Sequence, residues 1–456
     1  MEIIKKRTTS TKSWCILAAL LLFFLGMLAV GGVGVYNDSE QYITMHIHRE
    51  PLYPLFLAFF RVLCGDGYLS AVAAAQGVLT ALGIWTLTEY LAARFGLRLW
   101  EEILVLLLQL APHLVTRYVS AMHIFMENSV MSEALCLPLF SFFLCFLLRM
   151  LLEDKSSGAV LSLVFAWLLS MTRGQLMTTI LLWALLLGCK LVVKKKYRLL
   201  FIPVAAVVLM FALRSLTVHV YNYAVTGYFM GNTYGKVNTL TNVIYACDEE
   251  DGEVFPEGSL ERTFFDDFYV QAMERGLNHA FGGDSFGERA AYLEEKHDRL
   301  KFDVLEAGFS AYYFSLGEVD YYEQSSMSDE MAGKMIQRLL PACFGQWLYD
   351  YILLCRNGFV RSIAVVHPLL NFAALFLYLF SAGLSLWLVF EKRRFRAAVV
   401  MGTALLFIAA NVCATSTTIM CLSRYMIYGL SPFYIALYLV IRELFENKLI
   451  WRLKQK

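Results

Sequence analysis

The chain has 456 residues, of which 58% are hydrophobic and only 17% are charged, and its formal net charge is +1. Soluble domains average about 45–50% apolar and about 25% charged residues, so this composition excludes an ordinary soluble protein. An excess of acidic residues at 221–362, against an excess of basic residues in the rest of the chain, also argues against nucleic acid as a partner. The composition instead predicts a polytopic membrane protein.

Long apolar segments recur along the chain and predict an all-α membrane protein with about ten transmembrane helices. Roughly 20 apolar residues in a helix cross the ~30 Å hydrocarbon core of a bilayer. The first segment lacks the small-residue cleavage site of a removable signal peptide, so we interpret it as an anchor. The predicted spans are 14–35, 67–93, 103–121, 130–150, 158–173, 176–193, 199–220, 363–390, 397–414 and 425–445.

Short basic clusters alternate with these spans and predict the orientation of the chain. Basic residues in short loops favour the cytoplasmic side, and with ten spans all of these clusters fall on one face. Both termini are therefore expected in the cytoplasm of a plasma (inner) membrane protein. The basic clusters lie at 5–12, 94–98, 149–155, 194–198, 392–396 and 448–456.

The same topology divides the chain into three parts. Residues 1–220 form an N-terminal transmembrane region of about seven spans, with a first external loop at 36–66 that we expect to be catalytic. Residues 221–362 contain 23 acidic and 11 basic residues and form an external, mainly helical domain. Residues 363–456 form a C-terminal transmembrane region of about three spans.

Ionisable side chains cluster where this topology places the external membrane surface. Charged groups near membrane depth are costly, so they are usually paired or functional. Asp38 follows the first span directly, Arg173 ends the span 158–173, and Arg424 precedes the last span. A carboxylate can accept a proton from an attacking group, and arginine offers a planar fork for phosphate oxygens. This combination favours chemistry on a phosphate-bearing lipid.

Three motifs resemble those of the GT-C superfamily of glycosyltransferases, in the group of bacterial relatives of protein O-mannosyltransferases and the lipid A aminoarabinose transferase. The first motif is Asp38-Ser39-Glu40-Gln41-Tyr42 with the following Glu50-Pro51-Leu52-Tyr53-Pro54-Leu55. The second is Leu169-Ser170-Met171-Thr172-Arg173, which ends a span. The third is Arg424-Tyr425-Met426-Ile427-Tyr428-Gly429-Leu430-Ser431-Pro432, which opens the last helix.

The resemblance implies a membrane enzyme that moves a sugar from a polyprenyl-phosphate donor to an acceptor hydroxyl or amine on a lipid, glycan or protein. Asp38 would be the general base, and inversion at the anomeric carbon is expected. Ser39 separates Asp38 from Glu40, which leaves Asp38 as the better base candidate. The donor phosphate would be bound by Arg173, Arg424 and Tyr425. The residues expected to bind the acceptor or to support the site are Glu40, His48, Glu50, Tyr53 and Glu127.

Several alternatives stay open at the level of sequence. No cofactor is indicated with certainty, and His46 and His48 are weak candidates for ligands of a divalent metal. A set of aromatic residues in 221–362 either stacks on a sugar or packs in a core or membrane interface: Tyr312-Tyr313, Tyr321-Tyr322 and Trp347. A lipid-linked oligosaccharide flippase, an envelope-assembly scaffold, or a glycan polymerase or ligase would also carry external arginines. The sequence separates the polymerase or ligase poorly from the transferase.

Overall fold

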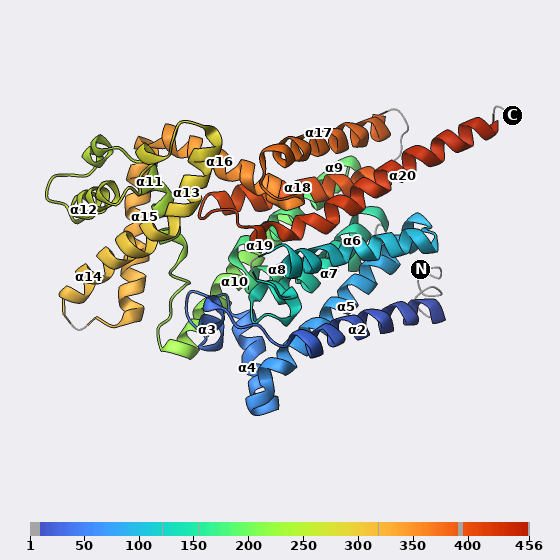
Figure 1. Cartoon of the computed structure of the whole chain (residues 1–456), viewed down its shortest axis with the longest axis horizontal. Helices are drawn as coiled ribbons and strands as arrows, with labels where there is room; N and C mark the ends of the chain where they lie inside the picture. Colours follow the sequence, from blue (N-terminus) through green and yellow to red (C-terminus); the bar gives the residue numbers. More distant parts are fainter. Residues whose placement is uncertain (1–9, 121, 154, 318, 391–394, 455–456) are drawn as a thin grey trace. The chain divides into compact units, whose positions relative to one another are not determined.

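The computed structural model describes residues 10–120, 122–153, 155–317, 319–390 and 395–454, and the side chains up to residue 445. Across these residues the regular elements are helices (Figure 1). In addition, Gly34 and Ser129 form one isolated β-bridge. The prediction of an all-α membrane protein is therefore confirmed. The basic residues predicted to face the cytoplasm at 5–7, 392–394 and 456 lie outside the described residues.

The chain separates into two compact units. The first, which we call the membrane unit, comprises the described parts of Met1–Thr217, Ser362–Ala410 and Arg424–Lys456. The second unit comprises Val218–Arg361 together with Asn411–Ser423. The sequence-based boundaries place residues 411–423 with the C-terminal spans, whereas their contacts group them with the second unit.

Each of the ten predicted spans falls mainly on one helix of the structure. Within the described residues, nine helices are long and apolar enough to cross a membrane, and the helix at 156–172 is shorter, with 17 residues. A helix satisfies its own backbone hydrogen bonds, which lipid cannot do. These helices are α2 (Thr11–Gly31), α5 (Tyr68–Phe95), α6 (Leu99–Tyr118), α7 (Ser132–Glu153), α8 (Ser156–Thr172), α9 (Thr178–Val193), α10 (Phe201–Thr226), α17 (Pro368–Phe390), α18 (Arg396–Ser416) and α20 (Leu430–Lys454).

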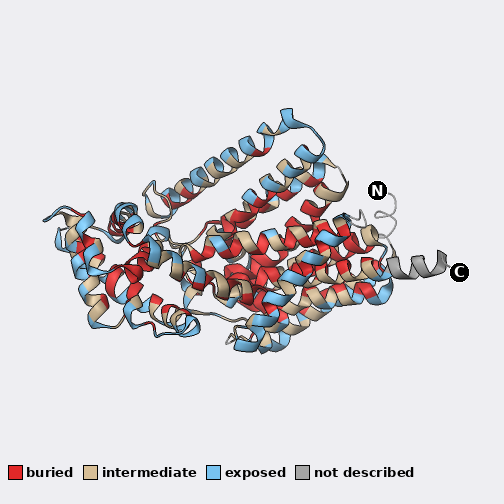
Figure 2. Cartoon of the chain, turned by 90° about the horizontal axis from the view of Figure 1, so that it is seen from above, coloured by how far each residue is buried: buried red, intermediate tan, exposed pale blue. Residues whose placement is uncertain are grey.

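Inside the membrane unit, α7 packs against α5 and α8, and α2 packs against α5. Residues coloured as buried gather in the interior of the packed helices (Figure 2). Gly83 of α5 allows a close approach, because a Cβ there would lie 3.2 Å from the carbonyl oxygen of Pro138 in α7. Small residues at such crossings let helices in membranes approach closely. The packing places the N-terminal end of α7 beside the loop that follows α2.

The predicted first external loop contains two short helices, α3 (Asn37–Ile43) and α4 (Leu52–Cys64). Backbone hydrogen bonds hold its beginning in place: Gly34 donates to Asn128 O at 2.9 Å, and Val130 donates to Gly34 O at 2.8 Å. A Cβ on Gly34 would lie 2.8 Å from the side chain of Ile124, so a larger residue here would require that side chain to shift. The loop is therefore fixed against the segment that leads into α7.

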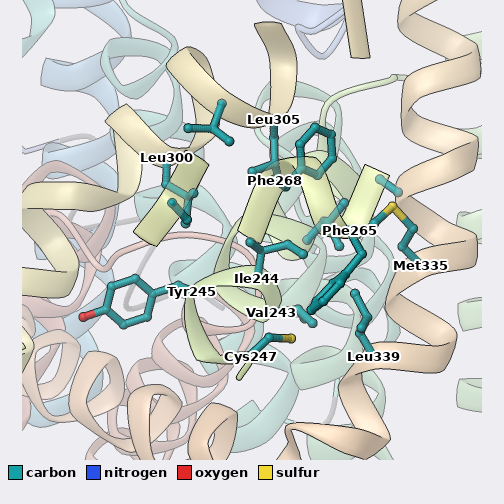
Figure 3. Packing of buried hydrophobic residues seen from close by; sticks show 14 of the residues in the cluster. Val243, Ile244, Tyr245, Cys247, Phe265, Phe268, Leu300, Leu305, Met335 and Leu339 are labelled. Carbon is teal, nitrogen blue, oxygen red and sulfur yellow. The ribbon is translucent and has the colours of Figure 1, made fainter. Parts of the chain in front are cut away.

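The second unit is a helical bundle with its own hydrophobic core. The core gathers side chains such as Ile244, Phe265, Phe268, Leu305 and Leu339, all buried (Figure 3). Burial of apolar surface contributes about 25 cal/mol per Å², so this cluster accounts for much of the stability of the unit. Its helices are α11 (Gly235–Ala246), α12 (Leu260–Glu274), α13 (Phe286–Leu300), α14 (Ala307–Ser315), α15 (Tyr321–Ala342) and α16 (Phe344–Ile363).

Candidate active site

Asp38 lies in the first turn of α3, and its neighbour Ser39 holds that turn in place. The buried Ser39 hydroxyl accepts a hydrogen bond from the Tyr36 backbone N–H at 2.8 Å and donates to Val130 O, also at 2.8 Å. These bonds begin the helix and fasten it to the segment before α7. The serine that separates the two acids in the motif is thus a structural residue that fixes the position of Asp38.

The Asp38 carboxylate is bound by two arginines from distant parts of the membrane unit. Arg49 Nη2 donates to Oδ1 at 3.0 Å, and Arg424 Nη1 donates to Oδ2 at 2.8 Å. Arg49 is oriented by Gln41, whose Oε1 accepts from Nε at 2.8 Å, and its guanidinium lies 4.8 Å from the centre of the Tyr42 ring. Burial raises the pKa of Asp38, but Arg49 and Arg424 together hold that pKa below its ordinary value.

Glu133 joins the two arginines that the sequence predicted as donor ligands. It lies in the first turn of α7 with no exposed side-chain surface, and its Oε1 is 2.6 Å from Arg173 Nη1 and 3.9 Å from Arg424 Nε. Arg173 also donates to the Ser132 hydroxyl at 3.2 Å, which in turn bonds to the Tyr42 hydroxyl at 2.9 Å. A buried carboxylate is stable only when its charge is compensated, and these arginines compensate it.

Tyr425 lies between the same two arginines. The Arg173 guanidinium is 4.7 Å from the centre of the Tyr425 ring, and that of Arg424 is 5.0 Å away. Arg424 Nη2 donates to the Tyr425 hydroxyl at 3.1 Å, and Gln175 Nε2 donates to the Tyr425 carbonyl at 3.1 Å. Cation–π contacts of this kind stabilise a guanidinium away from bulk water. The aromatic ring therefore keeps two like charges close together and oriented.

We call Asp38, Arg49, Glu133, Arg173 and Arg424 the charge cluster. It contains three guanidinium groups and two carboxylates, so it carries one surplus positive charge. Its accessible side is formed by Arg424 and Asp38, whose side chains are 31% and 28% exposed, while Glu133 is fully buried. The surplus charge and the accessible side suit the binding of one anionic group.

Glu50 lies next to the charge cluster but forms its own ion pair. Its carboxylate pairs with the guanidinium of Arg214 on α10. A Cβ on Gly174, the residue after Arg173, would lie 3.0 Å from Glu50 Oε1. Glu50 is buried, so it supports the wall of the site and is not accessible for proton transfer in this arrangement.

Tyr53 and Glu127 lie in the interior of the membrane unit. The buried Tyr53 hydroxyl donates to Gln76 Oε1 at 2.9 Å, and its ring packs edge-on against Tyr42 at 5.0 Å. Tyr53 therefore supports the site from behind. Glu127 is fully buried and lies 2.7 Å from His113 Nδ1, in a pair that does not include members of the charge cluster.

The remaining predicted residues lie at the surface of the first loop. Glu40 is exposed, and His46 and His48 are half-buried with ring centres 4.4 Å apart. His46 Nδ1 accepts a hydrogen bond from the His48 backbone N–H at 3.3 Å. Among the described residues, no three His, Cys, Asp or Glu side chains gather in a group that could hold a metal ion.

Sequence reasoning did not select Arg49 or Glu133 for the site. Arg49 stands inside the first-loop motif, directly before Glu50, and its place there was the one available signal. Glu133 sits within the predicted span 130–150 on the same side of the membrane as Asp38, so an acid at the start of a span was a second signal. Glu127, six residues earlier, has a similar position in the sequence but pairs with His113.

Comparison of the chain with models of known families, with curated proteins and with solved structures found no match. The function of a protein is determined by the chemistry of its site rather than by its fold. We therefore infer the function from the charges, contacts and burial of the charge cluster, together with the motif resemblance described above.

Proposed function

We propose that this chain is a membrane glycosyltransferase that moves a sugar from a polyprenyl-phosphate donor to an acceptor hydroxyl or amine. One observation carries the proposal. Asp38, Arg173 and Arg424 stand in three distant motifs, and they meet in one cluster with a surplus positive charge. These are the residues that the GT-C resemblance assigns to the base and to the donor phosphate.

The arginines would bind the donor phosphate. Guanidinium groups form bidentate, charge-assisted hydrogen bonds to phosphate oxygens. Arg424 is the most exposed of the three, and its Nη1 now binds Asp38. The donor phosphate would replace Asp38 as the partner of the Arg424 guanidinium. The negative charge of the phosphate would then stay paired while polyprenyl phosphate leaves the sugar, which is electrostatic stabilisation of the leaving group.

The same exchange would activate Asp38 as a base. Arg49 and Arg424 lower the pKa of Asp38 against the effect of burial, so the carboxylate is a weak base while both arginines hold it. When the phosphate engages Arg424, the pKa of Asp38 rises towards the range of a useful base. Donor binding thus prepares the base before the acceptor reacts.

The reaction then proceeds in one displacement. The acceptor oxygen or nitrogen attacks the anomeric carbon, and its proton passes to the Asp38 carboxylate. The bond between the anomeric carbon and the phosphate oxygen breaks, and polyprenyl phosphate leaves with the electron pair. Attack opposite the leaving group inverts the anomeric centre and requires no covalent sugar–enzyme intermediate.

The membrane orientation belongs to the same proposal. The charge cluster lies where α2 has ended and where α7 and the last helix begin. The basic segments 94–98, 149–155 and 194–198 lie at the other ends of the helices. Under the positive-inside rule, the termini are cytoplasmic and the cluster faces the exterior of a plasma (inner) membrane, where a lipid-linked donor replaces nucleotide sugars.

The test is a transfer reaction with the full-length protein in lipid nanodiscs. Synthetic polyprenyl-phosphate hexoses and pentoses are supplied with a membrane extract as the source of acceptor, and released polyprenyl phosphate is measured by mass spectrometry. We expect one donor to be consumed by the wild type and by Asp66→Asn, a variant of an exposed carboxylate in the same loop, but not by Asp38→Asn.

Each other outcome has a defined meaning. Equal donor consumption by Asp38→Asn would exclude Asp38 as the base. Tight donor binding without release of polyprenyl phosphate, in the wild type as in Asp38→Asn, would contradict a transferase and favour a flippase or a scaffold. These two classes need the surplus positive charge but no base.

A further inference from the structure

A pocket within the second unit combines polar and aromatic side chains from three segments. Asn242 comes from α11, Trp347, Asp350 and Tyr351 come from α16, and Ser416 comes from the segment 411–423. None of these residues belongs to the charge cluster. Their arrangement therefore calls for an explanation separate from donor chemistry.

Three buried polar atoms at this pocket have no hydrogen-bond partner. They are Asp350 Oδ2 and both side-chain atoms of Asn242 that can form hydrogen bonds, Oδ1 and Nδ2. Asp350 is 6% exposed and Asn242 is 5% exposed, while the other carboxylate oxygen of Asp350 accepts from Gln346 at 3.1 Å. Buried polar atoms are nearly always paired, so unpaired ones in a native structure need a reason.

The pocket in this arrangement leaves no room for a water molecule that would pair these atoms. The unpaired set consists of two acceptors and one amide donor. Hydroxyl groups on adjacent carbons both donate and accept, so a ligand rich in hydroxyls would satisfy all three atoms. Burial raises the pKa of the Asp350 carboxyl group to about 7, so near neutral pH this group can either accept a hydrogen bond from a hydroxyl or donate one to it.

The opening of the pocket is lined by aromatic rings. Trp347 and Tyr351 are four residues apart on α16, and their ring centres are 5.2 Å apart with planes inclined by 17°. Both are half-buried, whereas Asp350, Asn242 and Ser416 are buried, so the rings are the more exposed part of the lining. Aromatic rings offer rigid apolar area beside polar groups, which suits the apolar face of a sugar ring.

We propose that this pocket binds a neutral sugar residue of the acceptor glycan. Rotation of the Trp347 side chain opens it, the sugar ring stacks on the aromatic pair, and two adjacent hydroxyls pair with Asp350 and Asn242. The acidic balance of residues 221–362, with 23 acidic against 11 basic residues, also favours a neutral ligand over a polyanion. The assignment as acceptor rests on the proposed function, but sugar binding itself does not.

The experiment uses the full-length protein in nanodiscs and saturation-transfer NMR with the methyl glycosides of glucose, galactose, mannose and N-acetylglucosamine. We expect at least one glycoside to bind. Trp347→Ala and Asp350→Asn should each weaken that binding roughly tenfold or more, which is the loss expected from one stacking or charge-assisted contact. Phe314→Ala removes an exposed ring elsewhere on the second unit and should bind as the wild type does.

The outcomes separate the pocket from the transferase proposal. Donor consumption with no glycoside binding, or with equal binding by Trp347→Ala and the wild type, would overturn the pocket and leave the transferase standing. Glycoside binding that depends on Trp347 in a protein that consumes no donor would overturn the transferase and leave the pocket. Trp347→Phe keeps an aromatic ring and should retain most of the binding, which guards against a folding defect in Trp347→Ala.

Discussion

The membrane unit contains two networks of arginines and acids at opposite ends of its helices, and they differ in one respect. Far from the charge cluster, Arg442 of α20 donates to Glu101 of α6 at 2.6 Å, and Tyr438 donates to the same oxygen at 2.8 Å. Lys12 of α2 pairs with the neighbouring Glu102. Among the described residues these pairs join two basic groups to two acids, so the charges of the pairs balance.

The balanced network ties helix ends together. Arg442 also donates to the carbonyls of Phe95 and Gly96, which end α5, and its side chain is 12% exposed. In the charge cluster three arginines meet two acids, and the Asp38 and Arg424 side chains are more than twice as exposed as that of Arg442. The Lys12 side chain in the balanced network is itself 44% exposed, so exposure does not separate the two networks. The comparison teaches that a surplus charge, rather than an ion pair as such, marks the candidate site.

The largest effect is expected from Asp38→Asn, in the rate of sugar transfer. A positioned general base contributes about 10²–10⁴-fold to the rate, so transfer should fall by that factor. Donor affinity should stay equal or increase, because the carboxylate no longer competes for Arg424. Kinetics and donor binding on the same nanodisc preparation measure both quantities, and a loss of affinity in proportion to rate would show that Asp38 acts in binding.

Arg442→Ala should have the opposite profile. Removing one partner of a buried ion pair costs about 3–5 kcal/mol of stability, so the unfolding temperature should fall clearly. Donor binding at the far end of the helices should not change at temperatures where the variant is folded. Thermal unfolding and donor titration check the pair, and weaker donor binding with unchanged stability would contradict the distinction between the two networks.

Arg424→Ala should weaken donor binding and turnover together, by roughly ten- to a hundredfold, the range for loss of a hydrogen bond to a charged group. It should also change the pH dependence. Asp38 must be ionised to act as a base, and its pKa lies below the ordinary 3.8 in part because of Arg424. Without Arg424 the pKa of Asp38 rises in the free enzyme, so the acidic limb of the pH profile of kcat/KM, which reports the free enzyme, should move to higher pH.

The lowered pKa of Asp38 also determines how the stability of the folded protein depends on pH. A lowered pKa in the folded state means that the ion pairs of Asp38 stabilise the protein at pH values above about 4 and are lost as the pH falls below it. Arg61→Ala, in an exposed arginine of α4, is the matched control and should leave the pH–rate profile unchanged. An unshifted acidic limb in Arg424→Ala would mean that Asp38 does not set it.

Arg173→Lys should give the smallest effect, a loss of donor affinity of about tenfold. Lysine keeps the charge that Glu133 requires but lacks the planar fork for two phosphate oxygens. Donor titration of the variant measures this difference directly. Affinity equal to that of the wild type would show that Arg173 contributes only charge at this position.

The helices of the membrane unit could be predicted from the sequence, because each span is a continuous run of apolar residues long enough to cross a membrane. The ten predicted segments fall mainly on ten helices for that reason. The grouping of 411–423 with the second unit was not predictable, since it depends on contacts such as those of Met420 with the core of that unit. The composition of a short segment does not indicate which distant residues of the chain it will contact.

The site was predictable in part, for a related reason. The cost of a charge at membrane depth singles out Asp38, Arg173 and Arg424 from the sequence. Which charges pair is set by packing, and Asp38 and Arg424 are separated by 386 positions. Glu127 and Glu133 look alike in sequence, yet the first pairs with His113 and the second with Arg173.

The most direct test of the central claim is mass spectrometry of envelope lipids and glycans from a strain that lacks this gene, complemented with the wild type, Asp38→Asn or Asp66→Asn. The account predicts that polyprenyl-phosphate sugar accumulates and one sugar is missing from a glycan, and that the wild type and Asp66→Asn, but not Asp38→Asn, reverse both changes. Full rescue by Asp38→Asn, or a glycan profile unchanged by the deletion, would contradict it.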